Sequence, residues 1–304
     1  MNSGVSVVIP STGNISNLNR LLPSILLQSI GKDELQILVV FNGIAEDAFV
    51  ETKKIFQEKW PIVETLWIQG KGVNRARNAG LTKANKPFVM FLDDDCELHD
   101  KNIFKKILEL LESHPDFFAI GGGYILPASH GLFDEVYNYI QMNWFVCGQK
   151  NGNGPVTETQ YLLGGNFCLR RGVSNSHQLE FEPGIQYGGS ELDFFRKATK
   201  AGLRLGATEI DVTHNTHETF LSVGKKVFKQ GRGKHFIDEK FGNDFVVSEA
   251  KGGRYLFLRR IYSYWFWAGY YGAARKPWRL LLHILKDIGG YLNALRFNIL
   301  KRLD

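Results

Sequence analysis

The sequence predicts an α/β protein in which a largely parallel sheet is flanked by helices. Over the first hundred residues, short apolar runs alternate with longer segments of helical periodicity. Such alternation is typical of strands joined by right-handed helical crossovers, which make neighbouring strands parallel. The chain has 304 residues. That length suffices for one large α/β domain with an appendage, or for two modest domains.

The expected elements follow one another as strand, helix, strand. Residues 5–10 (VSVVIP) are almost wholly apolar and predict a buried strand, and residues 15–27 repeat apolar side chains with a helical period. The other expected strands are 37–41, 62–68 and 88–92, and the other expected helices are 45–59, 74–84, 101–112 and 191–201. Residues 116–190 are rich in glycine and aromatic residues and show no clear period.

Composition and cysteine spacing exclude several classes of protein. Hydrophobic residues make up 44% and charged residues 22% of the chain, as in an ordinary globular protein. Cys96, Cys147 and Cys168 are odd in number and widely spaced, which argues against a disulfide framework and a zinc site and indicates a reducing, cytoplasmic compartment. We expect no signal peptide, and no stretch reaches the roughly 18–20 apolar residues of a spanning helix.

The positive charge is concentrated near the C-terminal end. Residues 251–304 hold eleven Lys and Arg against two acids, a net charge of +9, whereas the other 250 residues hold 26 against 29. Aromatic residues interleave with these cations from about residue 249, and an apolar helical spacing follows Pro277, with a break expected at Gly289-Gly290. We therefore expect a body over 1–248 and a helical, aromatic and basic extension over 249–304.

This extension suits a membrane surface that carries anionic lipids, because tryptophan, tyrosine and basic side chains favour that interface. The alternative is a helical subdomain packed on the body or on a second protomer, so a homo-oligomer is possible. Nucleic acid is not expected as a partner, because no base-reading module is visible.

Three aspartates follow the expected strand 88–92. Asp93, Asp94 and Asp95 would each be ionised near neutral pH, with an unperturbed pKa of about 3.9, and would repel one another. Mg²⁺ prefers such carboxylate oxygens together with substrate phosphates. The alternative is an acidic cap for the next helix, for which Asp100 alone would serve. Because ligands of parallel sheets bind at the carboxyl ends of the strands, this edge is the predicted site.

Three further segments carry chemistry. Residues 70–80 form a glycine-containing loop that runs into a helix with Arg75 and Arg77, which suits a diphosphate, although surface salt bridges are the alternative. Glu191 stands at the start of an expected helix, as either a dipole partner or a general base. His214 and His217 are candidate metal or phosphate ligands.

Taken in order, these segments resemble the family-2 glycosyltransferases, which have the GT-A fold. The resemblance spans residues 5–235 and rests on VSVVIPSTGN, ILVVFNG, GVNRARNAGL, FLDDDC, LLGGNFCLRR, YGGSELDFFRKATKAGLRL, and VTHNTHETF followed by KQGRGKHF. The chain departs from the family at Phe41-Asn42, which replaces an acidic pair near the nucleotide base. It departs again at Ser190-Glu191, where Glu191 takes the place of the catalytic aspartate.

The resemblance implies an inverting transferase that moves a sugar from a nucleotide-diphosphate sugar to a hydroxyl of a glycan or lipid-linked acceptor, in cell-surface polysaccharide biosynthesis. Residues 1–115 would form its nucleotide-binding half and 116–248 its acceptor half. Glu191 would be the catalytic base. Asp95 and Asp93, with His214 or His217, would hold Mn²⁺ or Mg²⁺. The implied donor-binding residues are Pro10, Ser11, Thr12, Asn42, Arg77, Asp93, Asp94, Gly165 and Asn166.

Two other functions fit parts of the pattern. A phosphatase with an aspartyl nucleophile also uses a D-x-D motif after a strand, although on the first strand of its domain. A catalytically inactive nucleotide-sugar-binding protein would explain the departures at residues 41–42 and 190–191. We expect the protein in the cytoplasm, peripheral on the inner face of the membrane.

Overall fold

The computed structural model describes residues 4–150, 154–185, 189–242 and 254–287. Contacts divide the chain into two compact units, of which the first runs to Thr219 and the second begins at Phe220. The sequence predicted that the extension starts at residue 249. In the structure, the helix that follows Thr219 also groups with the C-terminal segment. The extent of the catalytic domain stays a prediction.

The first unit is built on an eight-stranded sheet with the order β3-β2-β1-β4-β9-β6-β10-β8. Strands β1 to β4 are mutually parallel, and β9 lies antiparallel between β4 and β6. The bounds are β1 Val5–Ser11, β2 Leu35–Asn42, β3 Val63–Ile68, β4 Phe88–Leu92, β6 Phe117–Gly121, β8 Thr157–Thr159, β9 Asn166–Arg170 and β10 Arg204–Ala207. The predicted α/β class with a mostly parallel sheet is confirmed.

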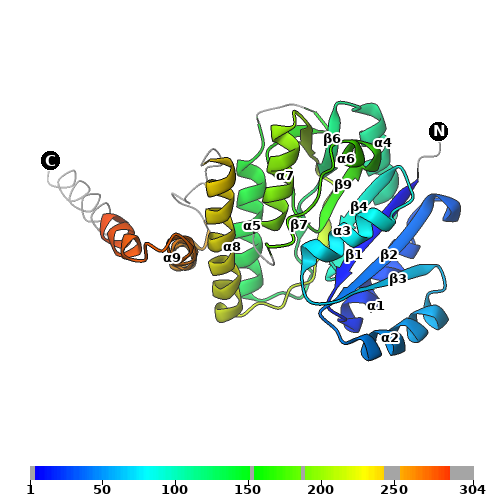
Figure 1. Cartoon of the computed structure of the whole chain (residues 1–304), viewed down its shortest axis with the longest axis horizontal. Coiled ribbons are helices and arrows are strands. Elements are labelled where there is room, and N and C mark those ends of the chain that lie inside the picture. The colour runs from blue at the N-terminus through cyan, green and yellow to red at the C-terminus, as the bar shows by residue number, and fades with distance from the viewer. Residues whose placement is uncertain (1–3, 151–153, 186–188, 243–253, 288–304) are drawn as a thin grey trace. The chain divides into compact units, whose positions relative to one another are not determined.

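Helices lie on both faces of this sheet (Figure 1). They are α1 Ile15–Leu26, α2 Glu46–Lys59, α3 Val73–Lys83, α4 Ile103–Ser113, α5 Leu132–Cys147, α6 Arg171–Ser176 and α7 Ser190–Lys200, with a 3₁₀ turn η1 at Lys32–Glu34. Every residue of β1 and β4 is buried, as expected for parallel strands covered on both faces. Phenylalanine rings from β4, β9 and α7 fill the core between them.

A second sheet brings distant segments to the carboxyl end of β4. It contains three short strands in the order β5-β11-β7, which are β5 Cys96–Glu97, β11 Val212–His214 and β7 Tyr124–Ile125. Cys96 pairs with His214 in the antiparallel register of β5 and β11. This small sheet therefore places a residue from position 214 beside the aspartates that precede Cys96.

The second unit contains α8 Phe220–Phe241 and α9 Leu256–Ala273, followed by a helical segment at 278–287. The two long helices pack closely through glycine. A Cβ on Gly231 would lie 1.9 Å from the carbonyl oxygen of Phe266, and one on Gly269 would lie 2.0 Å from that of Phe228. Gly231 of the KQGRGKHF segment is thus a helix-packing residue within this unit.

Among the described residues, none of the helices combines the length and hydropathy that a membrane crossing requires. The expected helical segment after Pro277 is present from residue 278. The break expected at Gly289-Gly290 lies outside the described residues.

Candidate active site

The three aspartates after β4 have three different partners. The hydroxyl of Ser11 donates to Oδ2 of Asp94 at 2.5 Å, and the amide of Asn17 lies 3.5 Å from its Oδ1. Asp93 turns toward Arg77, whose Nη2 lies 3.1 Å from Oδ1. Asp95 turns toward the second sheet. The local sequence therefore forms a turn that distributes like charges in three directions.

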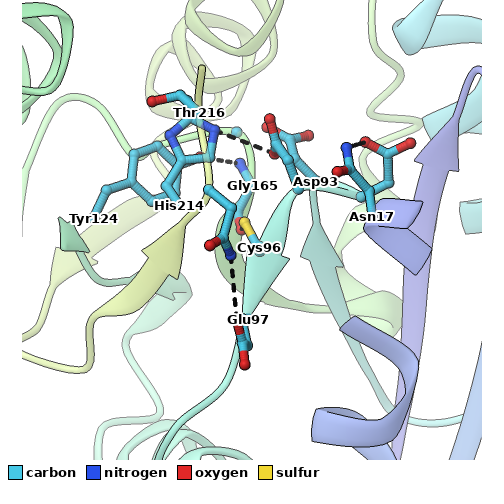
Figure 2. Close-up of polar contacts among 12 residues, drawn as sticks. Asn17, Asp93, Cys96, Glu97, Tyr124, Gly165, His214 and Thr216 are labelled. Carbon is cyan, nitrogen blue, oxygen red and sulfur yellow. Dashed lines mark hydrogen bonds and ion pairs between the residues drawn. The ribbon is translucent and has the colours of Figure 1, made fainter. Parts of the chain in front are cut away.

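His214 lies beside Asp95. Its Nε2 is 3.2 Å from Oδ1 of Asp95, and its side chain is 8% exposed. Ligand atoms of Asp93, Asp95 and His214 all lie within 4.8 Å of one another, and Figure 2 shows the imidazole turned toward the aspartates. His217 is exposed. Of the two histidines that the sequence left open, the structure places His214 at the site.

This donor set fits a divalent cation. Carboxylate oxygens suit Mg²⁺ and Mn²⁺, and an imidazole nitrogen is more readily accepted by a transition metal than by Mg²⁺. Burial, helped by the neighbouring charges of Asp95 and Asp93, raises the pKa of Asp94 to about 6, although the hydrogen bond from Ser11 opposes the shift. Burial also raises the pKa of Asp93, more than Arg77 lowers it. The site thus concentrates negative charge that a cation would stabilise.

Arg77 joins the aspartates to the start of α7. Its guanidinium lies 3.1 Å from Asp93 through Nη2 and 3.1 Å from Oε1 of Glu191 through Nη1, and Nη2 also donates to the carbonyl of Gly164 at 3.0 Å. Arg77 is 1% exposed. Burial opposes its charge, but the carboxylates of Glu191 and Asp93 leave its pKa raised.

Only one of the two arginines of α3 points inward, because residues two apart lie on different faces of a helix: Arg77 is buried and Arg75 is exposed. The guanidinium of Arg77 binds carboxylates and a carbonyl in this structure. Its contact with a donor phosphate stays a prediction.

Helix α3 also holds residues 181–185 in place. The side chain of Asn78 donates to the carbonyl of Phe181 at 2.8 Å and accepts from its N–H at 2.9 Å. Asn74, one turn earlier, donates to the carbonyls of Glu182 and Ile185 at 2.7 and 3.1 Å. These amides satisfy the backbone of an irregular segment that contains no helix or strand.

The glycine pair before β9 lies close to both carboxylates. A Cβ on Gly164 would lie 2.3 Å from Oε1 of Glu191, and one on Gly165 would lie 2.5 Å from Oδ2 of Asp93. A side chain at either position would therefore overlap the site. Asn166 donates to the carbonyls of Gly123 and Ile210 at 3.0 and 2.9 Å, and these two hydrogen bonds anchor the turn formed by the glycine pair.

The remaining expected donor residues lie at the ends of β1 and β2. Asn42 donates to the carbonyl of Ser11 at 3.0 Å and accepts from the N–H of Gly72 at 3.1 Å, so it ties β1 to the loop before α3. Pro10 lies within β1, and Thr12, directly after the strand, is exposed. Their contacts with a donor stay predictions.

Sequence reasoning missed two residues near His214. Tyr124 stacks on the imidazole with ring centroids 4.3 Å apart. Asp134 of α5 accepts from the hydroxyl of Thr216 at 3.0 Å and the N–H of Glu218 at 2.7 Å, and so holds the segment after His214. A signal for Tyr124 was present, since it follows the glycines that end β6 at the ligand-binding edge of the sheet.

Known proteins resemble this chain over most of its length. The profile described as glycosyl transferase family 2 matches residues 6–176. Glycosyltransferase AglE of Haloferax volcanii is 31% identical over 231 residues, which cover 76% of this chain and 72% of AglE.

Two solved structures share the fold. S. aureus TarS 1–349 superposes with a TM-score of 0.57 at 15% identity, covering 90% of this chain and 73% of TarS, and it has also been solved with UDP-GlcNAc. Mannosyltransferase PcManGT of Pyrobaculum calidifontis, solved with GDP-Man and Mn²⁺, superposes with a TM-score of 0.57 at 14% identity, covering 95% and 79%. At these identities the structures establish the fold alone, and that fold is GT-A.

Proposed function

The chain belongs to glycosyl transferase family 2 and is a glycosyltransferase, and from this premise we propose an inverting, metal-assisted sugar transfer to a hydroxyl of a glycan or lipid-linked acceptor. The observation that carries this proposal is the buried guanidinium of Arg77, which links the candidate metal site at Asp93 to the carboxylate of Glu191. A candidate base thus stands beside a candidate diphosphate site. An aspartyl phosphatase is disfavoured, because the chain belongs to a family of glycosyltransferases.

The residues of this site divide the chemistry between them. Asp93, Asp95 and His214 would hold Mn²⁺ or Mg²⁺, which would neutralise the diphosphate and act as a Lewis acid. Glu191 accepts the proton of the acceptor hydroxyl as its oxygen bonds to the anomeric carbon. The bond from that carbon to the phosphate oxygen breaks, and the nucleoside diphosphate leaves with the electron pair. Attack on the opposite side inverts the anomeric centre.

Arg77 and the glycine pair prepare this geometry. Arg77 holds Glu191 through Oε1, and the 19% exposure of the Glu191 side chain is compatible with contact to an acceptor hydroxyl. Gly164 and Gly165 let their backbone approach the carboxylates of Glu191 and Asp93 more closely than a residue with a Cβ could. Ser11 and Asn42 lie where the ribose and base would extend along the strand ends.

A thermal-shift panel of nucleotides and nucleotide sugars tests the donor. TarS and PcManGT bind a UDP-sugar and a GDP-sugar respectively, and Asn42 replaces an acid here, so both bases belong in the panel. We expect one nucleotide class to raise the unfolding temperature with Mn²⁺ and to lose that effect with EDTA, because a ligand stabilises the state it binds. Equal shifts with and without EDTA would contradict the metal role.

We further propose that the helical segment 278–287 places the enzyme on the inner face of a membrane, where it serves cell-surface polysaccharide biosynthesis. Apolar side chains stand at helical spacing and are each more than half exposed: Trp278, Leu281, Leu282 and Leu285. Four cations accompany this stripe: Arg275, Lys276, Arg279 and Lys286. An apolar stripe with flanking positive charge suits anionic lipid headgroups.

Vesicle cosedimentation tests the membrane proposal. The protein should bind phosphatidylcholine vesicles that contain phosphatidylserine and should lose most of that binding with Leu285→Glu, since the charge opposes burial of the stripe. Ile55→Glu on α2 is the matched control, because Ile55 is 52% exposed, comparable to Leu285 at 54%, but lies outside the stripe. Equal losses of vesicle binding in both variants would overturn the proposal. It would also be overturned if the wild type did not bind vesicles but formed a dimer in solution that Leu285→Glu dissociated.

A further inference from the structure

Tyr124 contacts both the candidate metal ligand His214 and the glycine pair before β9, and the mechanism above gives it no role. The residue is 4% exposed, in the short strand β7 beside β11. Its ring stacks on the imidazole of His214 at an interplanar angle of 24°. Its hydroxyl accepts the N–H of Gly165 at 2.8 Å, in the glycine pair that lies against Asp93. Figure 2 shows the tyrosine ring lying along the histidine, on the side away from the aspartates.

The backbone around Tyr124 is fixed by neighbouring elements. Tyr124 pairs with Val212, two residues before His214, so the two rings extend from adjacent strands. The N–H of Tyr124 lies 3.2 Å from the sulfur of Met142 in α5, and the preceding Gly123 donates its N–H to Asp211 at 2.6 Å. The backbone that carries the ring is therefore held on both sides, and the imidazole lies against that ring.

An imidazole that ligates a metal needs a fixed ring orientation, because Nε2 must point along one direction. Such rings are commonly fixed by a partner that does not touch the metal. Here one face of the imidazole lies against the Tyr124 ring, and its Nε2 lies 3.2 Å from Oδ1 of Asp95. The stack leaves Nε2 on the side that faces the carboxylates.

We propose that Tyr124 is a positioning residue that orients His214 as the third metal ligand and, through its hydroxyl, holds the Gly164-Gly165 turn against the donor sugar. This inference rests on the proposed metal-assisted transfer. It separates two functions of one side chain: the ring acts on the metal site and the hydroxyl acts on the donor loop.

Two substitutions separate these functions. Tyr124→Leu removes the aromatic stack and should weaken Mn²⁺ binding about 10- to 100-fold, the usual effect of losing a residue that supports a metal ligand. Tyr124→Phe keeps the stack and should leave Mn²⁺ affinity close to that of the wild type. It should raise KM for the donor about tenfold, because the N–H of Gly165 loses its acceptor in a buried setting.

A double-mutant cycle with His214→Ala provides the decisive comparison. Mn²⁺ alone is titrated into the full chain, and the free ion is followed by electron paramagnetic resonance. If Tyr124 acts through His214, the variant Tyr124→Leu/His214→Ala binds Mn²⁺ no more weakly than His214→Ala. Additive losses would overturn the positioning role, because Tyr124 would then act on the metal independently of His214.

The possible failures are distinguishable. If His214→Ala binds Mn²⁺ as the wild type does, the proposed ligand set is wrong. If His214→Ala weakens binding and Tyr124→Leu does not, the ligand set stands and the inference about Tyr124 falls. Tyr124→Phe guards against a folding defect, since equal Mn²⁺ losses in the Phe and Leu variants would show that the stack is not the cause.

Discussion

Replacing Asp95 by alanine is expected to lower the rate of sugar transfer at least about a thousandfold while the fold stays intact. The variant removes one of the two carboxylates that face His214, and a metal ion at a departing diphosphate contributes several kcal/mol of charge stabilisation. The fold should survive because the backbone carbonyl of Asp95, which accepts from the N–H of Asn215 at 2.8 Å, is unchanged. The measurement is the transfer rate against Mn²⁺ concentration, with circular dichroism for the fold.

A surface acid provides the matched control for this variant. Asp116 pairs with Arg204 at 2.8 Å, and its side chain is 62% exposed. Asp116→Ala should transfer sugar at the wild-type rate. Unchanged turnover in Asp95→Ala would exclude Asp95 from the reaction and remove the main support for the metal-assisted mechanism.

Replacing Glu191 by glutamine is expected to lower kcat about 10²- to 10⁴-fold, the range in which a general base contributes. Glutamine keeps an oxygen that can accept a hydrogen bond from Nη1 of Arg77, so the position of the side chain is largely retained. The carboxylate that would accept the proton is lost. Donor and Mn²⁺ binding should therefore change little. The measurements are kcat with saturating acceptor and donor affinity by thermal shift.

The exposed Glu209 provides the control for Glu191, as an acid that forms no part of the site. Glu209→Gln should keep the wild-type kcat. If Glu191→Gln also keeps it, the base is another group and the role that the resemblance assigned to Glu191 is wrong. A loss of Mn²⁺ binding in Glu191→Gln would point to a structural role through Arg77.

The strands and helices of the first hundred residues were predictable because each has a strong local pattern. Strand β4 was expected at 88–92 and is observed at Phe88–Leu92, and the helix expected at 101–112 is α4 Ile103–Ser113. Helix α5 was missed because its buried face carries Asp134 among Val136, Tyr137 and Phe145, which obscures the apolar period. That polar residue is buried because it holds the segment after His214.

The choice between His214 and His217 was beyond the sequence. The two histidines lie three residues apart in one short segment, and only the pairing of Cys96 with His214 in the second sheet decides which one meets Asp95. The contacts of the Arg77 guanidinium were equally beyond prediction from the sequence. An arginine at the start of a helix suits a phosphate, yet this one bridges carboxylates of residues 16 and 114 positions away.

The sequence alone therefore determined the α/β class, the strand end that carries the acids, and the family to which the motifs point. These properties depend on residues near one another in the chain, where periodicity and strand-end position apply. The tertiary structure decided which histidine joins the aspartates, that Arg77 links Asp93 to Glu191, and that Tyr124 lies behind His214. Some of these contacts join residues more than a hundred positions apart in the chain. They are set by strand order and helix packing, which a local pattern does not specify.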